Sequence, residues 1–575
     1  MPTAIAIQPE DTRIADTRHG LRIDVSGLGH VAGRAHRVLD GITFSVSPGE
    51  LVAIVGGSGA GKSTLLDAVA GIRPAAEGCV AFDGVDADEH RAAFRTALGY
   101  VPQDDIIHRD LTVEATLRYA ARLRLPEGTS IDAIDAAVAS TLATLDLEHR
   151  AGVRVAALSG GQRKRVCIGV ELVTAPRAFF LDEPTSGLDP ATAAGLMRTL
   201  RRLADQGSTV VLTTHGTDDL RHCDRVLFLA PGGRLAFDGA PDEALGAFGV
   251  GAFADIYDRV AGGASVTPAR RANEEPARRM ETPPTPAVPA VRQGDGAPRA
   301  LGPLRQWAVL SRRNVDLLRS SRLTLAIMLG SPILVIAMFA TLFDPGAFNP
   351  VDPHPSSAMM ITYWMAFAGF FFGLTYGLLQ VVTELPILRR ERFVHLRVGP
   401  YLLAKVAVLL PVLLGVNVFM LVVLRALDRL PDASAATYVG LTVTLMLDAL
   451  AALALGLLAS AAVGDPAQAT LALPMLCFPA VLFSGGVLAV RSMALPGELL
   501  SLVTLDRWAF EGLGAQLDLP GRLSGARAAG GPAFLAEHGG AFSGSVLLEW
   551  LVLAAFSVLL LAAAARMIDR RTGTS

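Results

Sequence analysis

"LVAIVGGSGAGKSTLLDAVAG" (residues 51–71) places an apolar strand, a glycine-rich loop and an apolar helix one after another. The loop, "GGSGAGKS" (56–63), has the spacing G-x-x-x-x-G-K-S that is typical of a phosphate-binding loop. Its glycines let successive backbone N–H groups curl around phosphate oxygens at a helix N-terminus. The residues predicted to form this nucleotide site are Gly56, Gly57, Ser58, Gly59, Ala60, Gly61, Lys62, Ser63 and Thr64.

Two side chains of this loop have expected roles. Lys62 is expected to reach the β- and γ-phosphates, and the Ser63 hydroxyl is expected to bind Mg²⁺. Of the 51 basic residues in the chain only three are lysine, namely Lys62, Lys164 and Lys405. A compact ammonium suits a phosphate loop better than a planar guanidinium does. A lysine at position 62 of a chain that otherwise uses arginine therefore supports the assignment.

A second predicted strand ends in two carboxylates. In "AFFLDE" (178–183), Asp182 is expected to hold Mg²⁺ and Glu183 to polarise the attacking water. An Asp–Glu pair after a strand is more often an ordinary solvated turn. Its position downstream of the phosphate loop and directly before "PTSGLD" favours the catalytic interpretation.

The composition indicates a chain that is part soluble and part membrane-embedded. Of its 575 residues 51% are hydrophobic, and the mean hydropathy is +0.42. The formal net charge of −3 offers no basic field, so no nucleic-acid partner is expected. The four cysteines have no paired spacing, which argues against a disulfide framework or a zinc site. The first twenty residues are polar, so no signal peptide is expected and the N-terminal part should stay in the cytosol.

Changes in composition divide the chain into segments. Short apolar runs between helical segments are typical of buried parallel strands joined by crossover helices, and a mixture of seven prolines with charged residues is typical of a linker. The expected organisation is a disordered N-terminus (1–20), an α/β domain (21–260), a Pro-rich linker (264–300), an amphipathic connecting helix (301–322), a transmembrane domain (323–566) and a cytosolic tail (567–575).

Six apolar stretches of the second half are long enough to cross a bilayer. They cover residues 323–343, 358–382, 401–424, 436–463, 469–490 and 545–566. Arginines precede the first stretch, separate the second from the third and follow the last. The positive-inside rule therefore predicts a multi-pass protein of the cell membrane with cytoplasmic N- and C-termini.

Besides Arg566 at the very end of the sixth stretch, three charged residues fall within these stretches. Asp448 lies near the middle of the fourth, where an ionisable residue is costly and usually faces a cavity or a partner. It is expected either to line the translocation route or the dimer seam, or to pack between helices in a protonated or hydrogen-bonded form. Lys405 and Glu549 lie near span ends, where long side chains reach water, and are assigned no role.

Taken in order, the motifs of residues 21 to about 245 resemble the ATPase domain of ABC transporters. By comparison with that family, Gln103 in "GYVPQDD" corresponds to the Q-loop residue that touches Mg²⁺ or water, and "LSGGQ" (158–162) corresponds to the signature motif. Asp189 in "SGLD" belongs to the D-loop, and His215 in "TTHG" contacts the γ-phosphate.

The resemblance implies a fold, cofactors and site residues. The implied fold is an α/β P-loop ATPase domain, with a RecA-like core and a helical subdomain, followed by an all-α six-helix transmembrane domain. The implied cofactors are ATP and Mg²⁺. The catalytic residues would be Glu183, His215 and Gln103, and the metal ligands would be Ser63, Gln103 and Asp182.

In this family the signature of one chain caps the ATP that the other chain holds. The residues that would complete a partner's site are Ser159, Gly160, Gly161 and Gln162. One phosphate loop and one signature per chain thus imply a dimer, with a second copy or with a related half-transporter. Family members usually stack an upstream aromatic residue on adenine, but residues 27–41 contain none, and His30 or Val31 is nearest to that role.

The domain order and several longer segments resemble the White-type, or G-subfamily, half-transporters and their bacterial relatives. These segments are "PQDDIIHRDLTVEATLRYAARLRLP" (102–126), "TELPILRRERFVHLRVGPYLLAKVAVLLPV" (383–412) and "DRWAFEGLG" (506–514). The resemblance implies an ATP-driven exporter that moves a lipid-like or amphipathic substrate across the cytoplasmic membrane by alternating access. "RRER" (389–392) and the 301–322 helix are expected to receive the movement of the ATPase domain.

Two other functions are considered. A mechanotransmitter would use ATP to do work or to signal across the membrane without moving a substrate. A large external domain would favour it, and the outward loop of roughly 491–544 is small for one. A soluble ABC ATPase that acts on nucleic acid or ribosomes does not fit six apolar stretches.

Overall fold

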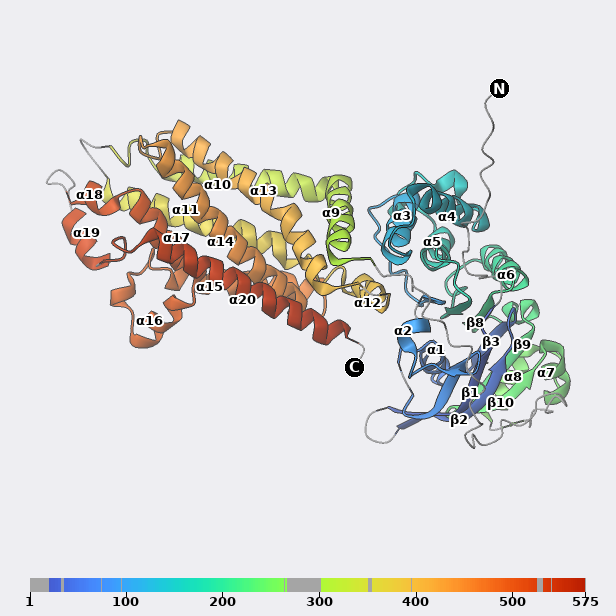
Figure 1. Cartoon of the computed structure of the whole chain (residues 1–575). Coiled ribbons are helices and arrows are strands. Elements are labelled where there is room, and N and C mark those ends of the chain that lie inside the picture. Colours follow the sequence, from blue (N-terminus) through green and yellow to red (C-terminus); the bar gives the residue numbers. More distant parts are fainter. Residues whose placement is uncertain are drawn as a thin grey trace, which may run out of the picture. The chain divides into compact units, whose positions relative to one another are not determined.

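The computed structural model describes residues 20–32, 36–73, 75–94, 96–262, 264–265, 301–349, 354–394, 396–524, 531–538 and 540–573. The chain divides into two compact units (Figure 1). The first comprises Met1–Gly302 and Phe393–His395, and the second comprises Pro303–Arg392 and Leu396–Gly573. The predicted N-terminal segment 1–20 and the predicted linker 264–300 lie almost entirely outside the described residues.

The first unit contains two sheets. The larger has the strand order β10 (Arg234–Gly239), β9 (Arg225–Ala230), β3 (Leu51–Gly56), β8 (Thr209–Thr213), β7 (Ala178–Leu181) and β6 (Leu98–Val101). All its neighbours pair in parallel except β10 and β9. The smaller is antiparallel, with the order β2 (His36–Val46), β1 (Ile23–Ala32), β4 (Glu77–Phe82) and β5 (Val85–Asp86).

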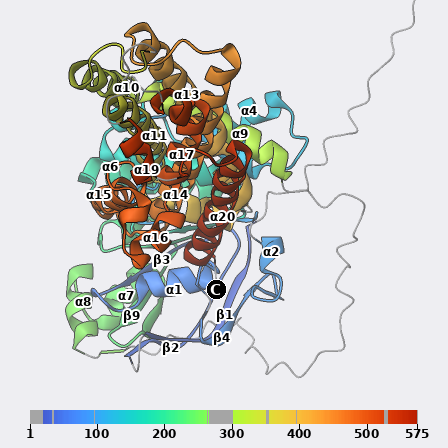
Figure 2. The same ribbon diagram turned by 90° about the vertical axis from the view of Figure 1, so that its left-hand side faces the viewer.

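Eight α-helices accompany these sheets. They are α1 (Lys62–Val69), α2 (Arg91–Phe94), α3 (Val113–Arg124), α4 (Ile131–Thr144), α5 (Gly160–Leu172), α6 (Pro190–Asp205), α7 (Pro241–Phe248) and α8 (Phe253–Ala261). Helices α3, α4 and α5 pack together as a helical subdomain, and α7 and α8 lie beside β9 and β10 (Figure 1). Figure 2 shows α7 and α8 next to β9 from another side. Thr112 and Ser130 cap the N-termini of α3 and α4, each accepting a hydrogen bond from a first-turn amide.

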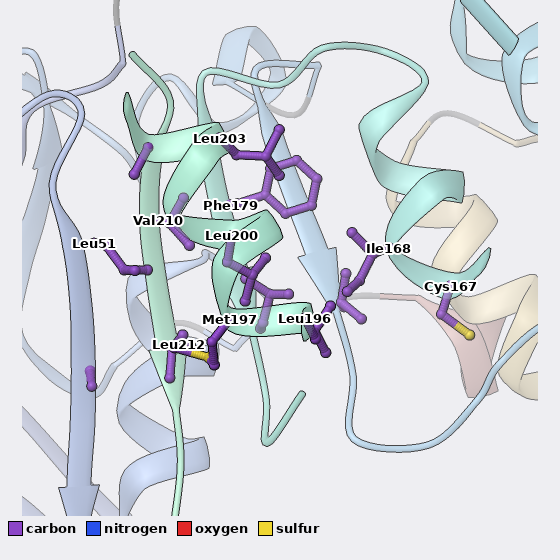
Figure 3. Packing of buried hydrophobic residues seen from close by; sticks show 14 of the residues in the cluster. Leu51, Cys167, Ile168, Phe179, Leu196, Met197, Leu200, Leu203, Val210 and Leu212 are labelled. Atoms are coloured by element: carbon purple, nitrogen blue, oxygen red, sulfur yellow. The ribbon is translucent and has the colours of Figure 1, made fainter. Parts of the chain in front are cut away.

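Alternate residues of the central strands enter two different cores. Leu51, Ala53 and Val55 of β3 lie in one cluster, which includes Phe179 of β7 and the apolar side of α6 (Figure 3). Val52 and Ile54 lie in the other cluster, against α1 and the small sheet. Because both faces are covered, the strand is apolar at every position and fully buried. The predicted α/β domain is confirmed.

The second unit is helical. Its helices are α9 (Pro303–Ser320), α10 (Arg322–Leu342), α11 (Pro355–Leu378), α12 (Leu385–Phe393), α13 (Val398–Ala426), α14 (Ala435–Ala462), α15 (Pro466–Phe483), α16 (Leu495–Leu502), α17 (Leu505–Gln516), α18 (Leu519–Leu523), α19 (Gly531–His538) and α20 (Val546–Thr572). Six of them are long and apolar enough to cross a membrane: α10, α11, α13, α14, α15 and α20. This agrees with the six predicted spans in number and order.

Helices α11 and α14 approach each other at glycine positions (Figure 1). A Cβ atom on Gly373 would lie 2.2 Å from the carbonyl oxygen of Ala449, and one on Gly377 would lie 2.6 Å from that of Leu453. From the other side, a Cβ on Gly456 would lie 2.5 Å from the Leu374 carbonyl oxygen. Since an apolar helix gains little from leaving one apolar phase for another, close backbone packing holds this pair together.

The structure differs from the sequence-based expectation in two segments. The fifth span ends at Phe483 rather than at residue 490. Two residues after this end, Gly485 adopts a positive φ of 88°. In the described part of 491–544 there are four short α-helices, and one of them, α17, packs against α11, α14 and α20. Apolar residues at helical spacing form α17, but the many Gly and Pro residues around it did not indicate a helix in the sequence.

Charged residues in the second unit are also more buried than expected. In α9, predicted as an amphipathic surface helix, Arg313 is buried and forms a bidentate pair with Glu391 of α12. Lys405 is 3% exposed, and its Nζ lies 2.7 Å from Glu384. Glu549 is 2% exposed. The expectation that the last two side chains reach water is wrong, because neighbouring helices cover both.

The α11–α14 contact predicts an effect of adding one methyl group. Gly373→Ala should destabilise the helical unit by about 1–3 kcal/mol, because the new Cβ must displace a carbonyl of α14. The matched control is Gly415→Ala in α13, where a Cβ meets nothing within 4 Å. It should be neutral, or stabilising by up to about 1 kcal/mol through helix propensity. Unfolding in mixed micelles measures both variants, and equal stabilities would contradict the packing argument.

Candidate active site

The predicted site residues meet at one edge of the large sheet. Strands β3, β8, β7 and β6 are parallel neighbours, so their carboxyl ends lie together. The phosphate loop follows β3, Gln103 follows β6, Asp182 and Glu183 follow β7, and His215 follows β8. Ligands of open α/β sheets bind at this edge.

The phosphate loop has the conformation that its glycines allow. Gly59 and Gly61 have φ angles of 77° and 94°, and a Cβ on Gly61 would lie 2.8 Å from the Val38 carbonyl oxygen. Lys62 is 6% exposed, and its ammonium donates to the carbonyl oxygens of Gly56 and Gly57 at 3.0 and 3.1 Å. Burial lowers the pKa of Lys62, and the carboxylates of Glu183 and Asp182 oppose this shift. A phosphate group suits this ammonium because it supplies the negative charge that the loop carbonyls lack.

Asp182 is held by two hydroxyl groups. Its Oδ1 accepts hydrogen bonds from Ser63 Oγ at 3.0 Å and from Thr213 Oγ1 at 2.6 Å. A buried carboxylate next to a serine hydroxyl fits Mg²⁺, which takes one or two such oxygens and completes its shell with water and phosphate. Thr213, on β8, was not singled out from the sequence, and a threonine at a strand end carries no signal of its own.

Glu183 is the centre of a second group. Its Oε2 accepts a hydrogen bond from Gln103 Nε2 at 3.0 Å, and its Oε1 lies 2.8 Å from His215 Nε2. The three predicted catalytic residues are therefore in contact. Glu183 also has a φ of 46°, which is unfavourable for a residue with a Cβ and costs roughly 1–3 kcal/mol. Its amide hydrogen-bonds to Thr213 Oγ1 at 2.9 Å, which helps to hold the turn.

A buried carboxylate supports the two loops that carry these residues. Asp219 is 5% exposed, and its Oδ2 accepts hydrogen bonds at 2.6 Å from the hydroxyls of Thr185 and Thr214. The first hydroxyl belongs to the turn after Glu183 and the second to the residue before His215. Asp219 is therefore a positioning residue, and the sequence analysis missed it.

The signature motif forms the start of α5. Ser159 is the N-cap, and a capping box joins it to Gln162. Gly161 is needed for close packing, since a Cβ there would lie 2.2 Å from Thr192 of α6. Ser159 and Gly160 are exposed. Residues 56–64 and 158–162 are all described, and no hydrogen bond joins the two segments.

Lys164 ties the signature helix to the loop that carries Gln103. It is 5% exposed, and its ammonium donates to the carbonyl oxygens of Pro102 at 3.0 Å and of Gln103 at 2.7 Å. Arg163 lies beside it, 3.4 Å from Asp105. The sequence analysis assigned no role to Lys164. The scarcity of lysine was the available signal, because it marked positions where a compact cation is required.

The remaining predicted residues lie nearby. Asp189 is the exposed N-cap of α6 and accepts a hydrogen bond from the Thr192 amide at 3.0 Å; hydrogen bonds from Thr192 hold the pKa of Asp189 below its usual value. Val31 is 41% exposed at the end of β1, one residue after His30. Which of these two contacts adenine stays a prediction.

The contacts of Lys164 predict that its removal loosens the loop of Gln103. In Lys164→Met, amide hydrogen exchange at residues 103–107 should accelerate about tenfold or more, since a hydrogen bond to a charged group contributes roughly 1.5–3 kcal/mol. Arg150→Met is the control, because it removes a charge from an exposed position of the same helical subdomain. Unchanged exchange in Lys164→Met would show that the loop does not depend on this ammonium.

Both units of the chain match known families. Residues 39–186 match the family described as ABC transporter, and residues 305–515 match the family described as ABC-2 type transporter. The chain is 36% identical over 524 residues to the ABC transporter ATP-binding/permease protein Rv1747 of Mycobacterium tuberculosis, over 88% of this chain and 59% of that protein.

Two further matches cover a smaller share of the chain. Over 222 residues the chain is 37% identical to ABC transporter G family member 6 of Arabidopsis thaliana, which covers 37% of this chain and 30% of that protein. Among solved structures, cbiO1 from Clostridium perfringens, part of an ABC transporter complex, has a TM-score of 0.37 and 32% identity over 40% of this chain and 92% of that one. The chain thus spans about three fifths or less of the length of the two curated relatives. It belongs to the ABC transporters, with an ABC ATP-binding domain first and an ABC-2 type membrane domain second.

Proposed function

We propose that this protein is an ATP-driven exporter that works as a dimer and moves a lipid-like or amphipathic substrate across the cytoplasmic membrane. The observation that carries the proposal is the presence, in one chain, of the Lys62–Asp182–Glu183–His215 constellation and of six membrane-length helices. ATP hydrolysis supplies the energy, and the membrane domain supplies the route.

The chemistry at the ATP site follows from the contacts of Glu183. This carboxylate is the base that takes a proton from the attacking water. Both its oxygens are engaged, by Gln103 and by His215, so water reaches Glu183 by displacing one of these contacts. Mg²⁺ bound by Ser63 and Asp182, with Gln103 beside it, would neutralise charge on the phosphates. Lys62 turns from the loop carbonyls to the β- and γ-phosphates.

The dimer is proposed from the geometry of the signature. Ser159 and Gly160 present the start of α5 to solvent and make no hydrogen bond to the phosphate loop of their own chain. A helix N-terminus with free amides favours a phosphate group. The partner's ATP would supply this group, so that two chains form two shared sites. A second copy or a related half-transporter is the partner.

Three elements are proposed to carry the movement of the ATP-binding domain to the spans. Two ion pairs join these helices. Arg313–Glu391 joins α9 to α12, and Lys405–Glu384 joins α13 to the residue just before α12. Tyr401 also donates to Glu384, at 3.0 Å. Buried pairs resist separation because each would leave an uncompensated charge. Helices α9, α12 and α13 therefore move as one piece.

Topology and cargo are proposed from the distribution of charge. Arginines before α10, along α12 and at the end of α20 favour cytoplasmic N- and C-termini. The exposed side chains of the spans are predominantly apolar, which suits an apolar or amphipathic cargo. The packing of α17 within the helical unit favours transport over mechanotransmission, because it leaves little outer segment to act as a separate device.

The export proposal is tested with inside-out vesicles that contain the full chain. Candidate lipids and amphipathic drugs should accumulate in the lumen only with ATP, and the same compounds should stimulate ATP hydrolysis. Glu183→Gln vesicles are the control for passive uptake. ATP hydrolysis that no compound stimulates, together with ATP-dependent signalling across the membrane, would favour a mechanotransmitter instead.

Glu183→Gln is expected to abolish turnover and to preserve ATP binding. Loss of a general base lowers kcat by roughly a hundredfold or more, whereas the phosphate loop is untouched, so the Kd for ATP should stay within about threefold of wild type. Glu148→Gln, at an exposed position of the same domain, is the control and should behave as wild type. Hydrolysis near the wild-type rate in Glu183→Gln would refute the assignment of the base.

Mixing two inactive variants tests the shared site. Lys62→Ala damages the phosphate loop and Ser159→Arg damages the signature. A mixed dimer with shared sites holds one doubly damaged site and one intact site. Random assembly should then restore roughly a quarter of wild-type hydrolysis, because about half of the dimers are mixed and each has one working site. No recovery would contradict independent shared sites, and one vanadate-trapped nucleotide per mixed dimer would then separate strict coupling from a site within one chain.

A further inference from the structure

Two buried carboxyl groups belong to helices that pack against each other inside the membrane unit. Asp448 is on α14, and Asp506 is in the first turn of α17. Both side chains are 0% exposed, and none of their four carboxyl oxygens has a hydrogen-bond partner. The two groups are close enough to interact electrostatically. This pair belongs neither to the ATP site nor to the buried ion pairs Arg313–Glu391 and Lys405–Glu384.

The surrounding helices leave room for the pair. Helix α17 lies against α11, α14 and α20 (Figure 1), which brings Asp506 into the helical unit. Gly369 of α11 faces Asp448, and a Cβ there would lie 3.1 Å from its Oδ2. Because Asp448 is covered within one protomer, the prediction that it lines a dimer seam does not fit the structure.

The other charged and titratable groups near the pair do not neutralise it, and the buried Glu549 of α20, which faces Gly512 of α17, is itself acidic. Asp506 acts electrostatically on Tyr363 of α11 and on Cys477 of α15, and neither residue carries a positive charge. Arg507 follows Asp506 in sequence but lies 2.9 Å from Glu511 and donates to Ser501 at 2.6 Å. Within the part of the chain that the structure describes, no Lys, Arg or His forms an ion pair with either aspartate.

An ionised carboxylate in such a place is strongly disfavoured. Burial without a partner disfavours the charged form of any carboxyl group. Two adjacent carboxylates disfavour it further, since like charges repel when water is excluded. The pair is stable in this packing only when a cation binds it, and a proton is the smallest one and needs no further ligands.

We propose that Asp448 and Asp506 form a proton-binding site between α14 and α17, which holds protons while these helices are packed together and releases them to water when they separate. The site couples the arrangement of the membrane domain to pH. It goes beyond the proposed export function, because it requires neither ATP nor a cargo.

The direction of the pH effect follows from linkage. The packed arrangement binds more protons than the separated one, so acid favours packing and alkali favours separation. Above the ordinary range of a free carboxyl group, the equilibrium constant for separation should rise by up to about tenfold per pH unit for each proton released.

Carbodiimide labelling tests whether the pair is protonated. Dicyclohexylcarbodiimide is apolar and modifies protonated carboxyl groups, so full-length protein in lipid nanodiscs should be labelled at Asp448 or Asp506 at pH 7–8. The exposed Asp432, whose side chain is 93% exposed, should remain unmodified and serves as the internal control. Peptide mass spectrometry reads the sites. Absence of label at both aspartates would overturn the proposal. Loss of label with millimolar Na⁺ would identify a sodium site instead, and would also overturn it.

A second measurement tests the coupling. Amide exchange in α17, corrected for the intrinsic pH dependence of exchange, reports separation of this helix. The opening constant should rise with pH more steeply in wild type than in Asp448→Asn/Asp506→Asn, which keeps the shape and leaves Glu511 of α17 and Glu549 of α20 as the acidic groups there that still titrate. Identical pH profiles would refute the coupling. If the double variant does not fold, the labelling of the wild-type chain still decides whether the protons are present. Neither experiment uses ATP, so both outcomes are independent of the export proposal.

Discussion

The position of Asp182 makes the ATP site possible. One carboxylate oxygen accepts hydrogen bonds from Ser63 of the phosphate loop and from Thr213 of β8, and thereby joins three segments that are far apart in sequence. This contact depends on the parallel order β3, β8, β7, which places the ends of these strands side by side. Glu183, the next residue, has a left-handed backbone conformation, and its carboxylate contacts Gln103 and His215. Register in the sheet thus determines where the base is.

The three lysines show why residue type matters in a chain rich in arginine. All three are buried: Lys62 at 6%, Lys164 at 5% and Lys405 at 3% exposed. Each ammonium lies against oxygen atoms of a confined site, carbonyl groups in the first two and a carboxylate in the third. A guanidinium is planar, wider and directs its donors in a fixed fork. Lysine therefore suits these three compact sites, whereas arginine suits a bidentate pair such as Arg313–Glu391.

The sequence predicted elements whose signals are local. The phosphate loop, the carboxylates after β7 and six apolar helices each lie within one short stretch, and the structure contains all of them. Contacts between distant segments were not predictable in this way. Asp219 can bond to the loops after β7 and β8 only because these two strands are neighbours. Helix α17 packs inside the helical unit, which its own composition does not indicate. Lys405 and Glu549 were misjudged for the same reason, since span ends are exposed only where no other helix covers them.

The two units handle buried charge differently, and this difference bears on their roles. In the ATP-binding unit each buried charge of the site has dipoles around it: Lys62 has two carbonyls, and Asp182 and Asp219 have two hydroxyls each. Such dipoles offset part of the cost of burying a charge. In the membrane unit no hydroxyl group and no positively charged side chain among the described residues pairs with Asp448 or Asp506. A carboxyl pair that is stable only with a bound cation responds to its surroundings, whereas a satisfied network does not. The residues of the ATP site therefore keep a fixed arrangement, whereas the packing around the aspartate pair depends on a bound cation.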